Sequence, residues 1–521
     1  MMSSKNVVWI VCFSFLCSSI LSGSAMAALA ASLYTNAAAA PQQARLSVNT
    51  NNNCNPQLAD TSMPDLALFD AHTHITPSYN AGFVVSEMNN AGVEIANLYP
   101  IAGDTDSTSQ SFVAQYPGRF VTFVSLPDYP QNSQWLKDGE AYVSYVKAQL
   151  ETGKFYGIGE VNLRYYDNAS YTPPPAIYVP PDNELMLQIV NLSATYHVPI
   201  SFHFVPDNST DNVALQHMLS YNKNATFIWA HLGFNNMPLN ISTLNDYLLR
   251  YPNLYLDTAG IQNMMNEPPG APNSNWNIIV NQNSGRLNPA WQHFFDTWNS
   301  RILWGSDAGG GNDMRRWLNY ANNAVQGVTG NAVGHWRHAL AVLDQNAVHN
   351  IFSANAKFVL LKQARPAYNY SVASSNGQCT TVLVHSNSSI SSLSFDVVAN
   401  KLTFEAADSN GTSNYAVVSI PTSLIDGTFS VEVNGKNAPF TKTFNSTYNN
   451  IKVGYGGGID TIAVMAMPEQ TPPSAITSTG AVPANSNQQT SSQNWAPIMV
   501  VGIVIIIAVA AYSVMRKQRH K

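Results

Sequence analysis

Short apolar runs alternate with amphipathic stretches between residues 65 and 366. Each run is rich in β-branched or aromatic residues and ends in polar ones, and helical spacing follows several of the runs. Continuous apolar runs separated by helices are typical of a parallel sheet buried on both faces. Eight such units in about 300 residues predict a (β/α)8 barrel rather than an open sheet. The runs are 66–69, 92–99, 120–126, 156–161, 198–204, 226–230, 254–256 and 301–304.

The pattern changes to period two between residues 380 and 466. Short stretches such as 401–405 and 429–433 alternate apolar and polar residues, and Asn434-Gly435 is a strong hairpin signal. About seven strands in ~85 residues predict a small all-β sandwich after the barrel. This segment resembles the all-β modules that precede C-terminal anchors in archaeal surface proteins. The resemblance implies a spacer or attachment role, with carbohydrate binding as the alternative.

Both ends of the chain carry targeting signals. Lys5 precedes a mainly apolar run that leads to a small-x-small cleavage pattern, so residues 1–27 are predicted to be a secretory signal peptide. Residues 496–515 contain no charge and are long enough to form a transmembrane helix across a ~30 Å hydrocarbon core. The basic tail, residues 516–521, is then cytoplasmic. The sequence therefore predicts a single-pass protein of the cell membrane whose main domains are extracellular.

The segments beside the two targeting signals and the overall charge narrow the prediction further. An N-terminal extension is expected over 28–64, and a Pro/Ser/Thr/Asn-rich stalk over 467–495. Only 11% of residues are charged and the net charge is -6, which excludes a basic nucleic-acid-binding protein. Outside the signal, Cys54 and Cys379 flank the barrel and either form one disulfide or are free thiols.

Sequons suit a glycosylated exterior, although an Asn-, Ser- and Thr-rich chain also produces them by chance. A glycoprotein is therefore predicted, with chance occurrence of the sequons as the alternative. The N-x-S/T asparagines are Asn168, Asn191, Asn208, Asn224, Asn240, Asn369, Asn387, Asn410 and Asn445.

Histidines and carboxylates fall at the ends of the predicted strands. Residues i and i+2 of a strand point to the same side, so His72 and His74 present two imidazoles to one point. In (β/α)8 barrels the C-terminal strand ends form the face that carries the active site. The candidate residues at such positions are His72, His74, Glu160, His203, His231 and Asp307.

A divalent metal explains why these groups gather. A single histidine on a strand is more often a core residue, but burying this whole set without a cation is costly. Imidazole and carboxylate ligands favour zinc, with Mn, Fe, Co or Ni as alternatives, and the number of ions is one or two. Asp257, which ends the seventh run, either faces the site or serves a turn or cap.

These residues, in this order and spacing, resemble the metal-dependent hydrolases of the amidohydrolase superfamily. Two flanking words, Arg301-Ile-Leu-Trp-Gly-Ser-Asp307 and Asn350-Ile-Phe-Ser-Ala-Asn-Ala356, resemble its amidohydrolase-related, decarboxylase-like branch. The resemblance implies that His72, His74, His203 and Asp307 ligate a metal. It also implies that His231 ligates a second metal or contacts the reacting water, and that Glu160 bridges two metals if the site is dinuclear.

The resemblance implies a reaction as well. A bound metal lowers the pKa of water and supplies hydroxide at neutral pH, with Asp307 as the proton carrier and His231 helping to stabilise the oxyanion. The expected activity is hydrolysis of an amide, lactone or other ester of a small molecule. Non-oxidative decarboxylation on the same scaffold is one alternative, and a non-catalytic surface binding or structural protein is the other.

Two long connections, 162–181 and 261–288, follow strands and therefore lie on the face of the candidate site. They are either lids or substrate walls, or surface insertions without a role. If the substrate is a carboxylate, Arg164 and Arg286 are the expected anchors because a guanidinium binds a carboxylate in a bidentate way. The sequence identifies neither the substrate nor the oligomeric state.

Overall fold

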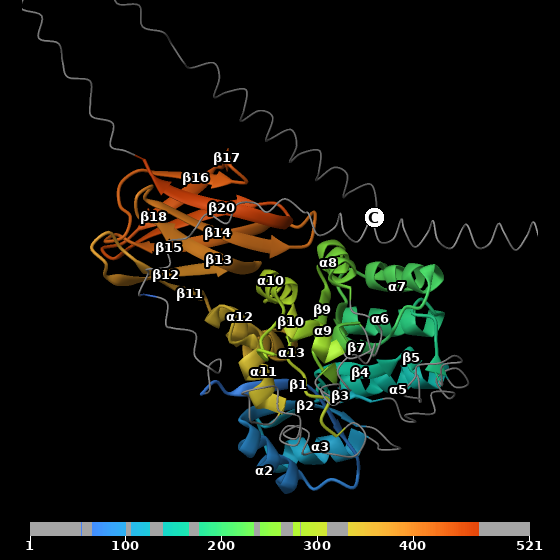
Figure 1. Cartoon of the computed structure of the whole chain (residues 1–521). Coiled ribbons are helices and arrows are strands. Elements are labelled where there is room, and N and C mark those ends of the chain that lie inside the picture. Colours follow the sequence, from blue (N-terminus) through green and yellow to red (C-terminus); the bar gives the residue numbers. More distant parts are fainter. Residues whose placement is uncertain are drawn as a thin grey trace, which may run out of the picture. The chain divides into compact units, whose positions relative to one another are not determined.

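Each apolar run of the sequence contributes a strand to one parallel, eight-stranded sheet with the order β1-β2-β3-β4-β7-β8-β9-β10. The sheet closes because residues after β10 pair with β1: Ala71 N donates to Trp304 O (3.0 Å), and Asp307 N donates to His72 O (2.9 Å). The predicted barrel is thereby confirmed (Figure 1). Its strands are β1 (Leu68–Ile75), β2 (Val93–Pro100), β3 (Phe120–Val124), β4 (Gly157–Asn162), β7 (Pro199–His203), β8 (Thr226–Trp229), β9 (Leu254–Asp257) and β10 (Ile302–Leu303).

This computed structural model of the protein describes residue 54 and residues 65–100, 106–125, 139–165, 177–233, 240–261, 275–281, 283–309 and 332–467. The predicted signal peptide and cytoplasmic tail lie outside the described residues, as do the predicted stalk except Met467, the N-terminal extension up to residue 64 except Cys54, and parts of both long connections. The predicted span 496–515 also lies outside them. Within the described ranges, no helix combines the length and the apolar composition that crossing a membrane requires.

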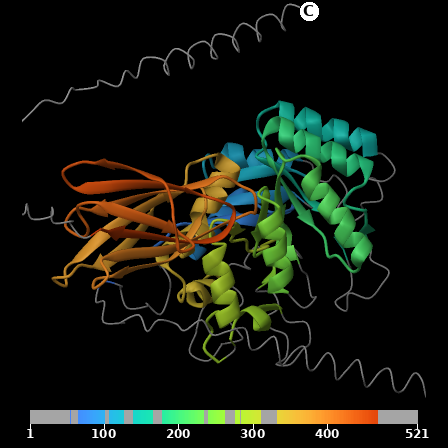
Figure 2. The same ribbon diagram turned by 90° about the horizontal axis from the view of Figure 1, so that it is seen from above.

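Helices surround the barrel, as Figure 2 shows from above. Asparagine, abundant in this sequence, begins several of them: the side chains of Asn80, Asn183, Asn208 and Asn240 each accept a backbone N–H of the first helical turn. The helices are α2 (Ala81–Ala91), α3 (Asp106–Gln115), α5 (Gly139–Glu151), α6 (Glu184–Tyr196), α7 (Ser209–Tyr221), α8 (Ile241–Arg250), α9 (Asn275–Ile279), α10 (Pro289–Thr297), α11 (Ala332–Leu340), α12 (Gln345–His349), the π-helix η5 (Asn350–Ala354) and α13 (Asn355–Leu361). A two-residue strand pair, β5 (Arg164–Tyr165) and β6 (Ile177–Tyr178), lies between β4 and α6.

Two antiparallel five-stranded sheets form the β-domain, in the orders β11-β12-β15-β19-β18 and β13-β14-β20-β16-β17. A separate apolar core, which includes Val384, Phe404 and Ile451, fills this domain. Its first strand precedes the boundary expected at residue 380, because the alternating segment from Tyr368 already pairs with β12. The strands are β11 (Tyr368–Ala373), β12 (Cys379–Ser386), β13 (Ser389–Asp396), β14 (Lys401–Asp408), β15 (Asn414–Pro421), β16 (Phe429–Val433), β17 (Lys436–Asn437), β18 (Phe440–Phe444), β19 (Tyr448–Tyr455) and β20 (Gly458–Ala466).

The β-domain packs against the N-terminal ends of barrel strands. Arg301, directly before β10, donates from Nη1 to Asp408 Oδ1 at 3.1 Å. Its neighbour Ser300 donates its backbone N–H to Ser389 Oγ at 3.0 Å. Ala407 of β14 belongs to the apolar core of the barrel. The two domains therefore form one compact unit, and the C-terminal strand ends are left to the candidate site.

Partly buried carboxyl groups where the two domains meet predict a pH-dependent stability. Burial, together with the negative charges of Asp344 and Glu405, raises the pKa of Asp296 on α10 to about 7. The folded protein then binds more protons than the unfolded chain between pH ~4 and ~7, so its free energy of unfolding falls as pH rises through this window. A shift of about three units corresponds to at most about 4 kcal/mol.

Asp296→Asn should remove most of this loss. We expect the difference in unfolding free energy between pH 5 and pH 8, measured by urea denaturation, to shrink by roughly 2–4 kcal/mol. Asp396→Asn is the matched control, because Asp396 is exposed and its Oδ1 accepts backbone N–H groups that an amide oxygen can also accept. An equal effect of both substitutions would contradict the assignment to Asp296.

Candidate metal centre

The ends of five barrel strands bring all six predicted residues together at the C-terminal mouth of the barrel. The first strand contributes two histidines because alternate residues of β1 face the barrel interior. The positions are His72 and His74 on β1, Glu160 on β4, His203 at the end of β7, His231 in the short turn η2 (Ala230–Gly233) after β8, and Asp307 after β10.

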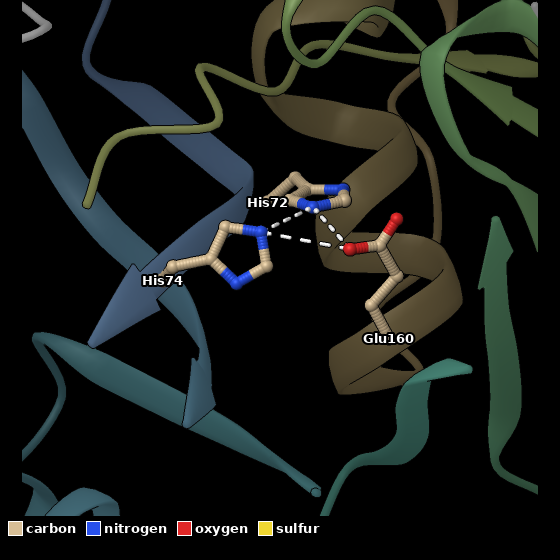
Figure 3. Close-up of side chains that lie close together, drawn as sticks. All are labelled: His72, His74 and Glu160. Atoms are coloured by element: carbon tan, nitrogen blue, oxygen red, sulfur yellow. Dashed lines mark hydrogen bonds and ion pairs between the residues drawn. The ribbon is translucent and has the colours of Figure 1, made fainter. Parts of the chain in front are cut away.

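One half of the site joins β1, β4 and the segment after β10. His72 Nε2 lies 3.2 Å from His74 Nε2. Glu160 Oε2 lies 3.5 Å from the first of these nitrogens and 3.6 Å from the second. Figure 3 shows the three side chains pointing toward one another. Asp307 Oδ1 completes this half at 3.1 Å from His74 Nε2 and 3.9 Å from His72 Nε2.

The other half of the site is formed by the histidines that face the second oxygen of Glu160. Glu160 Oε1 is 3.2 Å from His231 Nε2 and 3.3 Å from His203 Nδ1. The two imidazole rings meet edge to face, with centroids 4.8 Å apart. Each carboxylate oxygen of Glu160 therefore faces its own pair of histidines.

Hydrogen bonds on the far side of two rings determine which nitrogen carries hydrogen. His72 Nδ1 lies 3.0 Å from Asp257 Oδ2, and His231 Nδ1 lies 2.8 Å from Ala259 O. Both oxygens only accept, so both Nδ1 atoms are donors. In the neutral rings, the Nε2 lone pairs then face the oxygens of Glu160. Such an arrangement is repulsive unless positive charge lies between them.

The pKa shifts also indicate that the site needs positive charge. Burial alone would lower the pKa of His72, but the negative charges of Asp257 and Glu160 raise it well above its usual value. Burial is also outweighed at His231, where Glu160 raises the pKa to about 9. In return, and against the effect of burial, the charge of His72 holds the pKa of Glu160 well below its usual range. The site thus retains positive charge, as protons or as a metal cation.

The donor set and its spacing fit a metal. Bonds of ~2.0–2.2 Å from zinc to nitrogen or oxygen place neighbouring ligand atoms of a tetrahedron roughly 3.3–3.6 Å apart. The distances from Glu160 to its four histidines run from 3.2 to 3.6 Å. Two triads can hold an ion, and they share the glutamate: His72, His74 and Glu160, and Glu160, His203 and His231.

Two of the candidate ligands adopt a backbone conformation that is rare for residues other than glycine. The φ angles of His231 and Asp307 are 59° and 58°, which costs of order 1–3 kcal/mol each. Hydrogen bonds hold both: His231 N donates to Asp257 Oδ1 at 2.9 Å, and Asp307 N donates to His72 O at 2.9 Å. Strain of this kind is concentrated at functional sites.

Two buried aspartates support the ligands. Asp257, for which the sequence left a site role and a turn or cap role open, has both, since it contacts the His72 ring and accepts two backbone N–H groups. Asp70 was not predicted. Its Oδ1 accepts the backbone N–H groups of His72 and Ser306, both at 3.0 Å. Its position two residues before His72 was the available signal, because it places Asp70 on the same side of β1.

The expected carboxylate anchors do not join this cluster. The buried guanidinium of Arg164 is engaged by Asp211 at 2.8 and 3.0 Å and by Asp207 at 2.8 Å. Its bidentate partner in this structure is therefore an internal carboxylate, and a substrate-anchoring role of Arg164 stays a prediction. Arg286 donates from Nη1 to the carbonyl of His338 at 2.9 Å.

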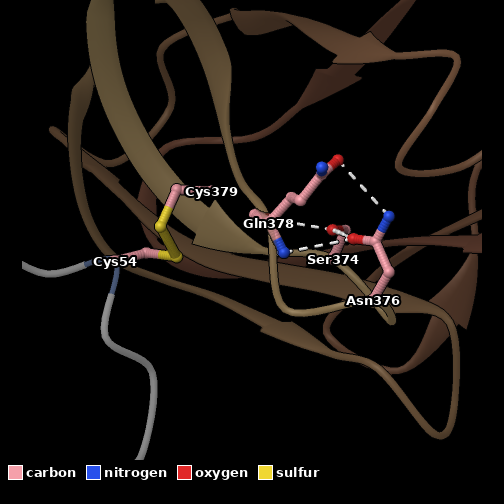
Figure 4. Close-up of a disulfide and its surroundings, with 5 residues drawn as sticks. All are labelled: Cys54, Ser374, Asn376, Gln378 and Cys379. Carbon is pink, nitrogen blue, oxygen red and sulfur yellow. Dashed lines mark hydrogen bonds between the residues drawn. A yellow bond between two sulfur atoms is a disulfide. The ribbon is translucent and has the colours of Figure 1, made fainter.

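Cys54 and Cys379 form a disulfide (Figure 4). The Cα atoms of Cys54 and Cys379 are 5.3 Å apart. Cys379 begins β12, directly after a turn in which Ser374 N donates to Gln378 O at 2.9 Å. The bond therefore attaches the segment before the barrel to the β11–β12 hairpin of the β-domain.

Comparison with known proteins gives no family. No family model matches the chain, and no curated protein matches it. Among solved structures, a zinc-bound amidohydrolase from Burkholderia multivorans is similar at 11% identity, covering 57% of this chain and 99% of that one, with a TM-score of 0.35. The phosphotriesterase homology protein from Escherichia coli is similar at 13% identity, covering 56% of this chain and 97% of that one, with a TM-score of 0.34. Similarity at this level does not assign a function.

A glycine next to His72 predicts a sensitive position. A Cβ on Gly305 would lie 2.8 Å from the Cβ of His72 and 3.2 Å from that of Ala259. Both neighbouring atoms are Cβ atoms of buried residues, and a Cβ cannot move without its backbone. Gly305→Ala should therefore displace His72 and lower the free energy of unfolding by about 1–3 kcal/mol. Gly454→Ala in β19 is the control, since its nearest atom would lie at an ordinary 3.7 Å. Equal denaturation midpoints for wild type and Gly305→Ala would contradict this packing.

Proposed function

We propose that this protein is a metal-dependent hydrolase with two metal positions that share Glu160, acting on an amide, a lactone or another ester. The observation that carries the proposal is the position of Glu160, whose two oxygens each face a different pair of histidines. A carboxylate placed in this way suits a bridge between two ions better than a ligand of one. The chemistry of the six side chains favours zinc or a similar divalent ion.

Each group of the site would then have its own role in hydrolysis. A divalent cation in such a site supplies positive charge that polarises a carbonyl group and makes water more acidic. The histidines and Glu160 are 0–9% exposed at their side chains, whereas Asp307 is 16% exposed. Asp307 is therefore the group best placed to take a proton from the attacking water and return it to the leaving group. His231 would hold the second cation, whose positive charge would stabilise the developing oxyanion.

Metal content tests the proposal directly. Elemental mass spectrometry of the purified chain should find two equivalents of divalent metal, one fewer or none in Glu160→Ala, and fewer in Asp307→Ala. His217→Ala is the matched control, because His217 is an exposed histidine on α7 that pairs with Asp182. Absence of metal after reconstitution with zinc or manganese would contradict the proposal.

Activity completes the test. Hydrolysis of a panel of amides, lactones and esters should be lost on chelation and restored by zinc or manganese. Release of carbon dioxide from carboxylic acids without hydrolysis would contradict the hydrolase proposal and show that the protein is a decarboxylase on the same scaffold.

We also propose that the protein is exported and anchored in the cell membrane. The support is the apolar segment at each end of the sequence, together with the Cys54–Cys379 disulfide, because disulfides persist in oxidising compartments outside the cytosol. All sequon asparagines within the described ranges are exposed, from Asn191 to Asn445. Glycosylation therefore remains a prediction that is sterically allowed.

Cell fractionation tests the location. The chain should sediment with membranes, and protease added to intact cells should remove its barrel and β-domain. A control cytosolic protein should survive the same treatment. Recovery of the intact chain with that cytosolic protein would contradict the proposal.

A further inference from the structure

One buried carboxylate contacts parts of both triads. Asp257 is the last residue of β9, and its side chain is fully buried. Its Oδ2 lies 3.0 Å from His72 Nδ1. Its Oδ1 accepts the backbone N–H groups of His231 at 2.9 Å and Ala259 at 3.0 Å. The carbonyl of Ala259 in turn accepts from His231 Nδ1 at 2.8 Å.

We infer that Asp257 is a positioning residue that selects the ligating form of His72 and fixes His231 at the same time, an inference that rests on the proposed metal centre. With Nδ1–H donated to Asp257, the His72 ring presents Nε2 to Glu160 and His74. The backbone contacts of Oδ1 hold His231 in its left-handed conformation. A carboxylate behind a ligating histidine fixes the ring tautomer and raises its basicity, and removing it lowers metal affinity by ~10–100-fold in general.

The two histidines of β1 differ in this support. His74 Nδ1 is buried and has no hydrogen-bond partner among the described residues, whereas His72 Nδ1 has Asp257. The form of His72 is therefore specified by the protein itself, and loss of Asp257 should affect the half of the site that contains His72 first.

An amide cannot replace this carboxylate. Asp257 must accept hydrogen on both oxygens, from a ring N–H on one side and from two backbone N–H groups on the other. An asparagine has only one accepting oxygen. If its NH2 faces His72, the ring must expose a bare Nδ1 and carry its hydrogen on Nε2, which then no longer ligates. If its NH2 faces the backbone, the N–H groups of His231 and Ala259 lose their acceptor.

Asp70 provides a matched control on the same histidine. It is also a fully buried aspartate, but it accepts the backbone N–H of His72, not its ring. Its other oxygen contacts the hydroxyl of Ser306, which can donate or accept. An amide at Asp70 can therefore keep each of these contacts, so Asp70→Asn tests for the general cost of losing a buried charge.

The experiment compares wild type, Asp257→Asn and Asp70→Asn as full-length chains. Chelator competition with zinc should show ~10–100-fold weaker binding of one metal equivalent in Asp257→Asn and little change in Asp70→Asn. In ¹⁵N-histidine-labelled protein, the Nδ1–H of His72 should give a downfield, slowly exchanging proton signal with or without metal. His72→Gln identifies that signal, and Asp257→Asn should remove it while Asp70→Asn keeps it.

The outcomes separate the two proposals. Wild type that binds no zinc overturns the metal centre, and the His72 signal then decides alone whether Asp257 positions the ring. Wild type that binds zinc, with unchanged affinity and an unchanged His72 signal in Asp257→Asn, overturns the inference about Asp257. Equal losses in Asp257→Asn and Asp70→Asn also overturn it, because they would show a general effect of buried charge.

Discussion

Negative charge buried at the mouth of the barrel is the constraint on which the site depends. Asp70, Glu160 and Asp257 are all buried there, and isolated carboxylates at such positions would be strongly unfavourable. Each is compensated differently. Asp70 and Asp257 accept backbone N–H groups, so the barrel itself satisfies them. Glu160 instead faces imidazole nitrogens that can change their protonation or bind a cation. Of these three carboxylates, Glu160 is the one that faces imidazoles with both of its oxygens, so the proposed chemistry centres on it.

The architecture follows from the sequence because its signals are local and repeated. Each apolar run became a strand, and polar residues at the strand ends became the site. Strands of a parallel barrel deliver their C-terminal residues to one rim, so six residues far apart in sequence could be grouped without any knowledge of distances. The prediction of β1 was the least accurate in length: the run 66–69 has four residues, but the strand, Leu68–Ile75, has eight, because the polar stretch that carries His72 and His74 continues to pair with β2.

Features that depend on partners distant in sequence were not predictable. Arg164 has the same local sequence whether it binds substrate or an internal carboxylate, and only the fold shows that Asp211 is its partner. Asp257 ends a strand, as the candidate ligands do, but its 3.0 Å distance to His72 shows that it supports a candidate ligand. The packing of the β-domain against Ser300 and Arg301 depends on complementary surfaces from two domains, which no period in the sequence reports.

Because of that packing, the two ends of the barrel could evolve independently of each other. The β-domain packs at the N-terminal strand ends, where residues such as Arg301 hold the two domains together. Among the described residues, the segments after β8 and β10 carry His231 and Asp307 and make none of these contacts. Insertions and deletions in those loops could therefore accumulate without disturbing the junction, and changes at the junction would leave the ligand geometry intact. A lineage of such proteins would be free to alter the candidate site while keeping its β-domain.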